Sequence, residues 1–238
     1  MSENAGNPPS ENPILSAYNG WASTKPFVTR SVTLVIISTS LLSMFINIGD
    51  ALNNNLRYTI YGLEIYRLIT ACLWCSGILN LIFAVLAFNQ MAPRLEHSSG
   101  SAGLLALMLC LDLCSNALFL IFSLLLKMMG DRIAEFKSSQ GFWNILMPLI
   151  VIECMHTPDS PRKLFFFPCD IPSKFYPIAL FGLFSLFSGV RIDMALSLLV
   201  GYAYSAGKLD RLKPSNARLK SWDEGCLRNF ANREGYVV

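Results

Sequence analysis

Residues 67–84 read RLITACLWCSGILNLIFA, an apolar run that begins with an arginine and contains two cysteines, a tryptophan and an asparagine. A run of this length and composition is typical of a membrane span, because ~20 apolar residues cross a bilayer as a helix. The chain has 238 residues, of which 53% are hydrophobic and only 15% are charged. Soluble domains carry ~25% charged residues, so the composition predicts a membrane protein.

Similar apolar segments recur along the chain. They cover residues 29–48, 68–88, 102–126, 142–155, 176–188 and 192–206. The sequence therefore predicts an all-α polytopic membrane protein with a six-helix transmembrane bundle. The fourth and fifth segments have only 14 and 13 residues and are short for a hydrocarbon core ~30 Å thick. Either flanking residues extend these two spans or the bilayer thins around them.

The basic residues predict the orientation and the division of the chain. With six spans, thirteen of the nineteen Lys and Arg residues lie on the side of the two termini. Cytoplasmic loops carry the excess of positive charge, so both termini are expected in the cytosol. We expect a polar cytosolic segment over residues 1–26, without a cleaved signal peptide. A membrane domain over 27–207 and a basic cytosolic tail over 208–238 follow.

The seven cysteines lie mostly inside apolar segments, and their odd number favours free thiols over a disulfide framework. Cys72 and Cys75 have the spacing of half a zinc or redox site. The next pair, Cys110 and Cys114, is spaced differently, and no soluble βαβ pattern surrounds either pair. The sequence therefore predicts no metal site and no cofactor.

Three short motifs resemble those of rhomboid intramembrane proteases. Tyr66 and Arg67 open the sequence YRLIT, which resembles the Trp-Arg-Leu-Ile-Thr entry to the second rhomboid span. Glu96, followed by GS at 100–101, resembles the Glu and Gly-Ser that follow that helix. Residues 193–201, DMALSLLVG, resemble the Ala-His-x-x-Gly-x-x-x-Gly of the sixth span, with Ser197 at the first glycine and Gly201 at the last. The resemblance implies a six-helix rhomboid-like fold over about residues 27–213.

Rhomboid catalysis requires a serine nucleophile in Gly-x-Ser-Gly on the fourth span, a histidine base on the sixth, and histidine and asparagine oxyanion donors on the second. Residues 138–141 read SSQG, so Gln140 is at the nucleophile position, and Met194 is at the base position. Cys75 and Asn80 are at the two histidine positions, and Ala84 is at the asparagine position. The resemblance thus implies a pseudoprotease, with no catalytic residue and no enzyme activity.

Two inactive branches of the superfamily resemble the chain, namely the derlins and the endoplasmic-reticulum proteins that carry a C-terminal ubiquitin-associated domain. Residues 166–172, FFPCDIP, are more similar to the second branch. Only 24 residues follow Pro214, so a ubiquitin-associated domain is not expected in this sequence.

The resemblance implies a client-binding scaffold in quality control and degradation, located in the endoplasmic reticulum membrane. Its expected partners are membrane lipid, membrane-protein clients and ubiquitin ligase or segregase machinery, and no nucleic acid.

Two carboxylates inside predicted spans leave another function open. Asp112 lies midway along the third span and Glu153 late in the fourth, where ionisable groups are costly unless they are paired or wetted. Asn116 is one turn after Asp112, and His156 is three residues after Glu153, so local pairing is expected. If both carboxylates instead faced one cavity, the protein would be a transporter or channel. A third hypothesis is a structural subunit of a larger membrane complex.

The loop between the fourth and fifth predicted spans contains three adjacent phenylalanines, residues 165–167, among prolines that disfavour a continuous helix. We interpret these aromatic residues as an anchor at the bilayer boundary, with a partner-binding patch as the alternative. The basic residues that follow the last span are interpreted as a topology signal, to which binding of anionic lipid adds a lesser part.

Overall fold

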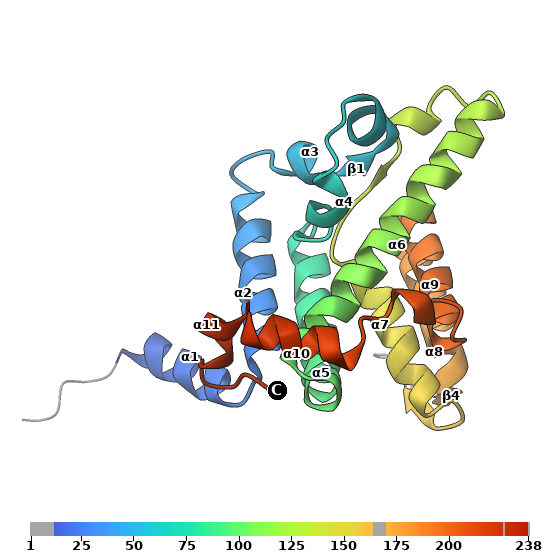
Figure 1. Ribbon diagram of the computed structural model, residues 1–238. Coiled ribbons are helices and arrows are strands. Elements are labelled where there is room, and N and C mark those ends of the chain that lie inside the picture. Colours follow the sequence, from blue (N-terminus) through green and yellow to red (C-terminus); the bar gives the residue numbers. More distant parts are fainter. Residues whose placement is uncertain (1–11, 164–169, 226, 238) are drawn as a thin grey trace, which may run out of the picture.

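The computed structural model describes residues 12–163, 170–225 and 227–237, and this part of the chain is mostly helical. Six apolar helices pack side by side (Figure 1). They are α2 (Phe27–Leu42), α5 (Ile78–Ser99), α6 (Ser101–Met128), α7 (Trp143–His156), α8 (Tyr176–Ser188) and α9 (Ile192–Ser205). Each predicted apolar segment thus contains all or part of one of these six helices.

Only two of these helices, α5 and α6, are long and apolar enough to cross a membrane by themselves. They have 22 and 28 residues, whereas α2, α7, α8 and α9 are apolar helices of 13 to 16 residues. A 14-residue helix is about 21 Å long at ~1.5 Å per residue. The count of six spans therefore stays a prediction.

The helix α7 forms the centre of the bundle. Eleven of its fourteen residues are buried, on all sides of the helix, as is typical of a helix that is apolar all round. It packs against α9, α6, α5 and α8. The Trp143 ring meets Phe184 of α8 with 4.4 Å between centroids, and Phe142, just before α7, meets Phe88 of α5 with 5.1 Å between centroids. Four apolar helices are therefore positioned directly against α7, whereas α2 packs on α5 and α6.

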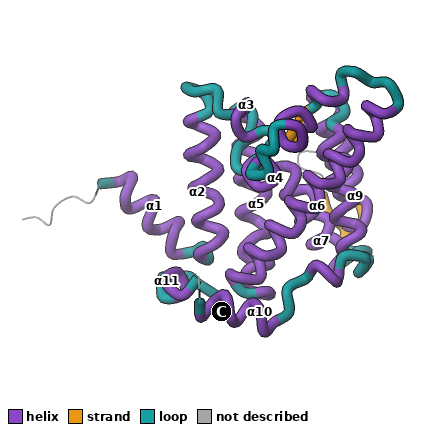
Figure 2. The backbone as a smooth tube through the Cα atoms, turned by 45° about the horizontal axis from the view of Figure 1, so that its top comes forward, coloured by secondary structure: helices purple, strands orange, loops and turns teal. Residues whose placement is uncertain are grey.

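The two ends of the bundle carry different elements (Figure 2). One end, called here the loop end, carries α3 (Gly49–Leu52), the π-helix η1 (Arg57–Tyr61), the 3-10 helix η2 (Ala134–Phe136) and the antiparallel pair β1 (Asn54–Asn55) and β2 (Ser138–Ser139). The other end, the terminal end, carries α1 (Pro13–Ser23), η4 (Asp210–Leu212), α10 (Asn216–Glu224) and α11 (Arg228–Ala231). It also carries the antiparallel pair β3 (Pro161–Lys163) and β4 (Asp170–Pro172), followed by η3 (Ser173–Phe175).

The second predicted span is not one continuous helix, and this expectation was wrong. A short helix, α4 (Arg67–Thr70), is followed by irregular backbone over residues 71–77, and α5 begins only after Gly77, whose φ is 83°. Neighbouring segments form hydrogen bonds with the polar backbone groups of this irregular stretch. Gly141 and Phe142 donate their amides to the carbonyls of Ala71 and Trp74, at 2.8 and 3.0 Å. Non-helical backbone at membrane depth is tolerated only where protein surrounds it in this way.

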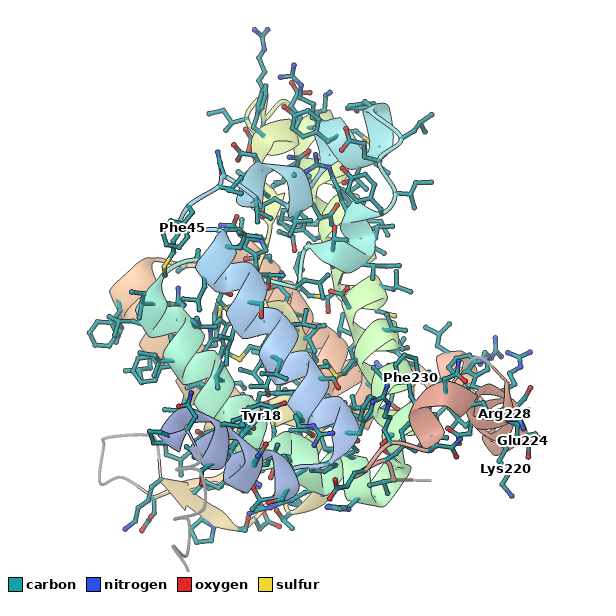
Figure 3. All side chains as sticks on the ribbon, turned by 90° about the vertical axis from the view of Figure 1, so that its left-hand side faces the viewer. Tyr18, Phe45, Lys220, Glu224, Arg228 and Phe230 are labelled. Atoms are coloured by element: carbon teal, nitrogen blue, oxygen red, sulfur yellow. The ribbon has the colours of Figure 1, made fainter. Side chains whose placement is uncertain are left out.

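The polar ends of the chain contain structure that the composition did not predict. The N-terminal segment forms α1, and the basic tail forms α10 and α11, which lie across the terminal end of the bundle. Lys220, Glu224 and Arg228 are exposed on this surface (Figure 3). The three phenylalanines at 165–167, and most of the motif at 166–172, lie outside the described residues.

Candidate functional site

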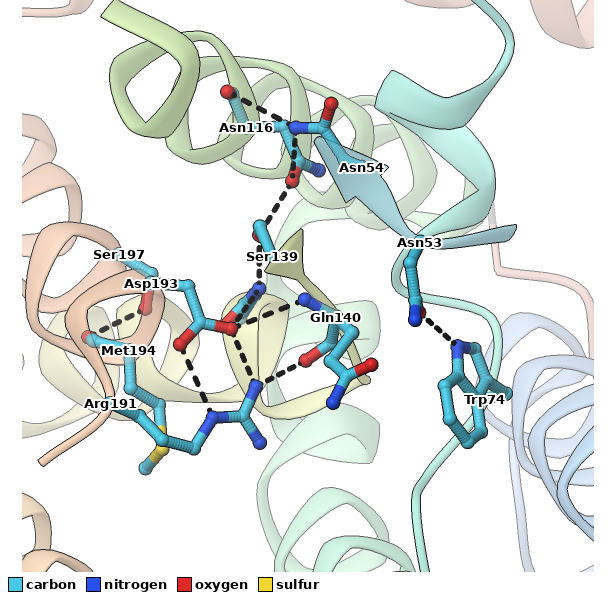
Figure 4. Close-up of polar contacts among 11 residues, drawn as sticks. Asn53, Asn54, Trp74, Asn116, Ser139, Gln140, Arg191, Asp193, Met194 and Ser197 are labelled. Atoms are coloured by element: carbon cyan, nitrogen blue, oxygen red, sulfur yellow. Dashed lines mark hydrogen bonds and ion pairs between the residues drawn. The ribbon is translucent and has the colours of Figure 1, made fainter. Parts of the chain in front are cut away.

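The candidate site lies where the first turns of α7 and α9 meet the segment 138–142 (Figure 4). Asp193, in the first turn of α9, is at its centre: its side chain is 5% exposed, and its Oδ2 atom is 2.5 Å from Arg191 Nη2. The same oxygen accepts hydrogen bonds from the Asn144 side chain and the Gln140 backbone amide, both at 3.2 Å. Arg191 also donates to the Gln140 carbonyl. One ion pair therefore fixes both backbone polar groups of Gln140.

A chain of buried polar side chains continues from Asn144 toward α6 and β1. Asn144 Nδ2 donates to Ser139 Oγ at 2.7 Å, and Ser139 Oγ donates to Asn116 Oδ1 at 2.9 Å. Asn54 Nδ2 donates to the same Asn116 oxygen at 3.2 Å, and Asn116 Nδ2 donates to Asp112 Oδ1 at 2.8 Å. Buried amides and hydroxyls are stable when they are hydrogen-bonded in this way. This polar chain joins β1, α6, β2, α7 and α9.

The two positions that correspond to the rhomboid nucleophile and base are close to this polar chain. Gln140 is half-buried and lines a hollow of about 470 Å³ together with Asn80 of α5 and Asp193. Met194 is buried and lines a smaller hollow of about 30 Å³, in which Asn80 is again a neighbour. The smaller hollow has about the volume that one water molecule occupies in the liquid. The structure thus brings Gln140, Met194 and Asn80 around two adjoining hollows.

The other two positions that correspond to catalytic groups lie away from these hollows. Cys75 is in the irregular segment before α5, where its buried backbone amide donates to Ser40 Oγ at 2.9 Å. Ala84 is fully buried in the core on α5. Asn80 donates from Nδ2 to the carbonyl of Ser76, in the irregular segment just before α5, at 2.9 Å. Of the three positions on this stretch, only Asn80 has a polar side chain at the hollows.

Hollows extend along the whole depth of the bundle between α5 and α8. Towards the terminal end, a third hollow of about 710 Å³ has Phe83, Leu86 and Leu180 in its walls. Helix α5 contributes residues to all three hollows, and α8 or the turn after it contributes the facing residues. We call this set of three hollows the α5–α8 cleft. Its rims carry exposed apolar side chains: Leu86, which lines the third hollow, is 52% exposed, and Val190, which lines the hollow of about 470 Å³, is 74% exposed.

The motif glutamate has a structural role at the terminal end. Glu96 is fully buried, and its carboxylate accepts the backbone amides of Val28 and Thr29, each at 2.8 Å. It also accepts the hydroxyls of Thr29, at 2.8 Å, and Ser101, at 2.6 Å. A carboxylate at a helix N-terminus satisfies orphan amides and complements the helix dipole. Glu96 therefore caps α2 from another helix and connects it to the start of α6.

The motif arginine organises the loop end. Arg67 is buried and donates from Nη1 to the carbonyls of Asp50, at 2.6 Å, and Asn53, at 2.9 Å. Its Nε atom is 2.6 Å from Glu64 Oε2, which also accepts the Tyr66 hydroxyl at 2.8 Å. These hydrogen bonds from Arg67 and Tyr66 lower the pKa of the Glu64 carboxyl. The Tyr-Arg pair thus fixes the loop before α4.

The small-residue motif lies where α9 approaches α7. A Cβ atom on Gly201 would be 2.7 Å from Pro148 Cα and 3.0 Å from Val151 Cβ. Ser197 is fully buried, and its hydroxyl donates to the Met194 carbonyl at 2.9 Å. Small residues at such spacing allow two helices to approach closely, and α9 packs against α7 here.

The two carboxylates inside predicted spans have different neighbours. Asp112 is paired with Asn116, as predicted, and lines a hollow of about 210 Å³ between α2 and α6. Glu153 is bound to Arg94 and Arg162, at 3.3 Å each, instead of to His156, so that prediction was wrong. It lines the hollow of about 710 Å³. Within the described residues the two carboxylates line different hollows, whereas the transporter hypothesis requires both to face one cavity.

Cys72 and Cys75 have free thiols, as do the other cysteines of the described residues. Over residues 12–163, 170–225 and 227–237, no group of three or more His, Cys, Asp or Glu side chains has an arrangement that could hold a metal ion. The Cys-x-x-Cys spacing therefore has no partner ligands in the part of the chain described.

Sequence reasoning missed the ion pair of Arg191 and Asp193 and the amides that extend it. Asn144 lies one turn after the SSQG segment, and Asp193 directly precedes the residue at the base position. A polar residue beside each degenerate position was the available signal. What could not be read from the sequence is that Ser139 and Asn116 connect these residues to β1.

Comparison with known sequences agrees with a membrane protein of this kind. The chain is similar to Rhomboid-like protein 15 of Arabidopsis thaliana, with 25% identity over 182 residues, which cover 74% of this chain and 45% of that protein. The chain therefore spans less than half the length of this curated relative. Residues 30–206, which include every residue of the candidate site, match the family described as eukaryotic integral membrane protein (DUF1751). Because this match covers most of the chain, the protein belongs to this family of eukaryotic integral membrane proteins, with a rhomboid-like sequence.

Proposed function

We propose that the protein is a catalytically inactive, rhomboid-like membrane scaffold that binds a membrane-spanning segment of a client protein in the α5–α8 cleft. The observation that carries the proposal is the cleft itself. Its rims present exposed apolar side chains such as Leu86 and Val190, whereas its floor holds Gln140, Asn80 and the Arg191–Asp193 ion pair. A helix entering from the bilayer would pack its apolar face on the rims and hydrogen-bond to the floor.

The degenerate positions support the absence of catalysis. A glutamine side chain is not a nucleophile of the kind used in acyl transfer, and the thioether of Met194 cannot accept a proton from one. The floor is also occupied by a structural ion pair, since Arg191 and Asp193 hold the Gln140 backbone. The arrangement can bind and orient a polar group, but Gln140 and Met194 supply neither a nucleophile nor a general base.

Purified wild-type protein is expected neither to cleave rhomboid model substrates nor to label with a fluorophosphonate. Gln140→Ser alone is expected to stay unlabelled, because the serine would face Met194 without a base. Gln140→Ser combined with Met194→His would still have cysteine and alanine in place of two oxyanion donors, each of which typically contributes ~10²–10³ in rate. An active rhomboid protease serves as the positive control. Labelling of the wild type that disappears on mutation of one serine would refute the proposal.

Client binding can be tested with a photo-crosslinking amino acid in native membranes. Placed at Leu86 or Val190 on the cleft rims, it is expected to capture membrane-spanning proteins. Placed at Ile121 of α6, which is 57% exposed but outside the cleft, it should capture lipid and little protein. Equal capture from all three positions would mean that the cleft is no binding site.

We further propose that the scaffold acts in quality control and degradation in the endoplasmic reticulum membrane, as inactive rhomboid relatives of the derlin kind do, with both termini in the cytosol. The rhomboid-like sequence and the shared position of the two terminal segments at one end of the bundle support this assignment. Fluorescent tagging identifies the organelle. Co-purification from that membrane should recover ubiquitin ligase or segregase machinery, and recovery of neither would count against a role in degradation.

A further inference from the structure

The hollow of about 710 Å³ at the terminal end of the α5–α8 cleft differs from the other two in its charge. Four basic side chains and one acidic side chain line it. The basic residues are Lys25, Arg94, Arg162 and Lys163, and the acidic residue is Glu153. Four positive charges and one negative charge leave an excess of three positive charges (4 − 1 = 3) around one concave surface.

Glu153 engages its two arginines only loosely. Arg94 Nη1 and Arg162 Nη1 lie 3.3 Å from its two carboxylate oxygens, whereas close charge-assisted hydrogen bonds measure about 2.7–2.9 Å. Each guanidinium carries five N–H donors. Both arginines therefore keep donors for a second anion.

Other contacts hold the basic groups at the hollow independently of Glu153. Arg162 donates from Nε to Ser173 Oγ at 3.1 Å, which fixes it to the start of η3. Lys25 donates from Nζ to the Asn89 carbonyl of α5 at 3.2 Å. The cations thus come from three separate elements, the turn before α2, α5 and β3, and converge on one space.

One part of the wall of the same hollow is apolar. It is formed by Phe83, Leu86 and Ala87 of α5, Ile150 of α7 and Leu180 of α8. The three α5 residues lie deeper in the bundle than Arg94, because they precede it by two to three turns of the same helix. A ligand that fills this space must therefore combine an anionic group with an apolar body.

We propose that this hollow binds an anionic phospholipid whose headgroup carries a phosphate monoester. A phosphate monoester has about −1.5 to −2 charges near neutral pH, which suits an excess of three positive charges better than the single charge of a diester. The phosphate would contact the arginines and lysines, and an acyl chain would lie along Phe83 and Leu180. Basic pockets between membrane helices are suited to such headgroups. The lipid would occupy one of the three hollows of the α5–α8 cleft, but its binding can be measured whether or not the cleft also binds clients.

The test measures binding of phosphatidic acid to the full chain in detergent, by native mass spectrometry and by equilibrium titration. Arg162→Gln combined with Lys163→Gln is expected to weaken binding by roughly tenfold to thirtyfold, because each basic residue near an anionic lipid contributes about 1 kcal/mol. The matched control is Arg218→Gln with Lys220→Gln. Those residues are exposed on α10 and do not line the hollow, so binding should change less than about twofold.

Weaker lipid binding could also result from misfolding of a variant. A variant that is expected to bind the lipid more tightly excludes this explanation. Glu153→Gln removes the one acidic group of the hollow, so phosphatidic acid is expected to bind several-fold more tightly. Inorganic phosphate tests the alternative soluble source, and phosphatidylcholine tests non-specific lipid association. The proposal is overturned if inorganic phosphate displaces the lipid at micromolar concentration, if phosphatidylcholine binds equally well, if the control pair weakens binding as much, or if Glu153→Gln weakens it.

Discussion

Replacement of Glu96 with alanine is expected to destabilise the protein by about 3–5 kcal/mol, because it leaves several buried donors without an acceptor. The carboxylate accepts two backbone amides, of Val28 and Thr29, and two hydroxyls, of Thr29 and Ser101, at 2.6–2.8 Å. Glu96 is fully buried, so these donors have no contact with bulk water in the folded protein. The loss would release the start of α2 from α5 and α6.

Thermal unfolding and denaturant titration of the purified protein in detergent measure this effect. Glu96→Gln is expected to lose less stability than Glu96→Ala. The amide oxygen still accepts hydrogen bonds, whereas the NH₂ group faces a backbone N–H donor. Glu224→Ala is the matched control. This glutamate is exposed at the end of α10, so its replacement should change the stability by less than about 0.5 kcal/mol.

Hydrogen exchange adds a local readout. In Glu96→Ala the amides of Val28 and Thr29 should exchange much faster, whereas those in the middle of α7 should change only as far as the global stability does. If Glu96→Ala and Glu224→Ala were equally stable, Glu96 would have no capping role.

The apolar segments could be predicted from the sequence because they follow from composition over windows of a dozen residues or more. All six contain a helix, and the bounds of α8 agree with the prediction to the residue. The break at residues 71–77 could not be predicted in this way. The break depends on hydrogen bonds to distant segments. The Ser40 hydroxyl accepts the amide of Cys75, and the Gly141 amide donates to the Ala71 carbonyl.

The candidate site, too, could be predicted from the sequence only in part. The positions of Gln140 and Met194 were found from motif spacing, which is a local property of the sequence. Their polar surroundings were not, since Asn54, Asn116 and Asp193 are separated by more than 60 residues from one another. Only the packing of α6, α7 and α9 brings them into one chain of hydrogen bonds.

Replacement of Gly201 with valine is expected to destabilise the protein by about 3 kcal/mol, the upper part of the range for overpacking in a close-packed core. Even a single Cβ atom would be 2.7 Å from Pro148 Cα. That neighbour is backbone and cannot rotate away, so α9 as a whole must move from α7. The matched control is Gly182→Val in α8, where a Cβ atom meets nothing within 4 Å, and its effect should stay below about 1 kcal/mol.

The displacement should also reach the candidate site, because Asp193 and Gly201 belong to the same helix. If α9 moves away from α7, the hydrogen bond of 3.2 Å between Asn144 and Asp193 lengthens, and Gln140 loses a partner of its backbone amide. Crosslinking of clients from Val190 should therefore fall in Gly201→Val at temperatures where the variant is still folded, while Gly182→Val retains it. Equal stability and equal crosslinking of the two variants would contradict the close approach of α7 and α9. Reduced stability with unchanged crosslinking would mean that the cleft is held by other contacts than this helix pair.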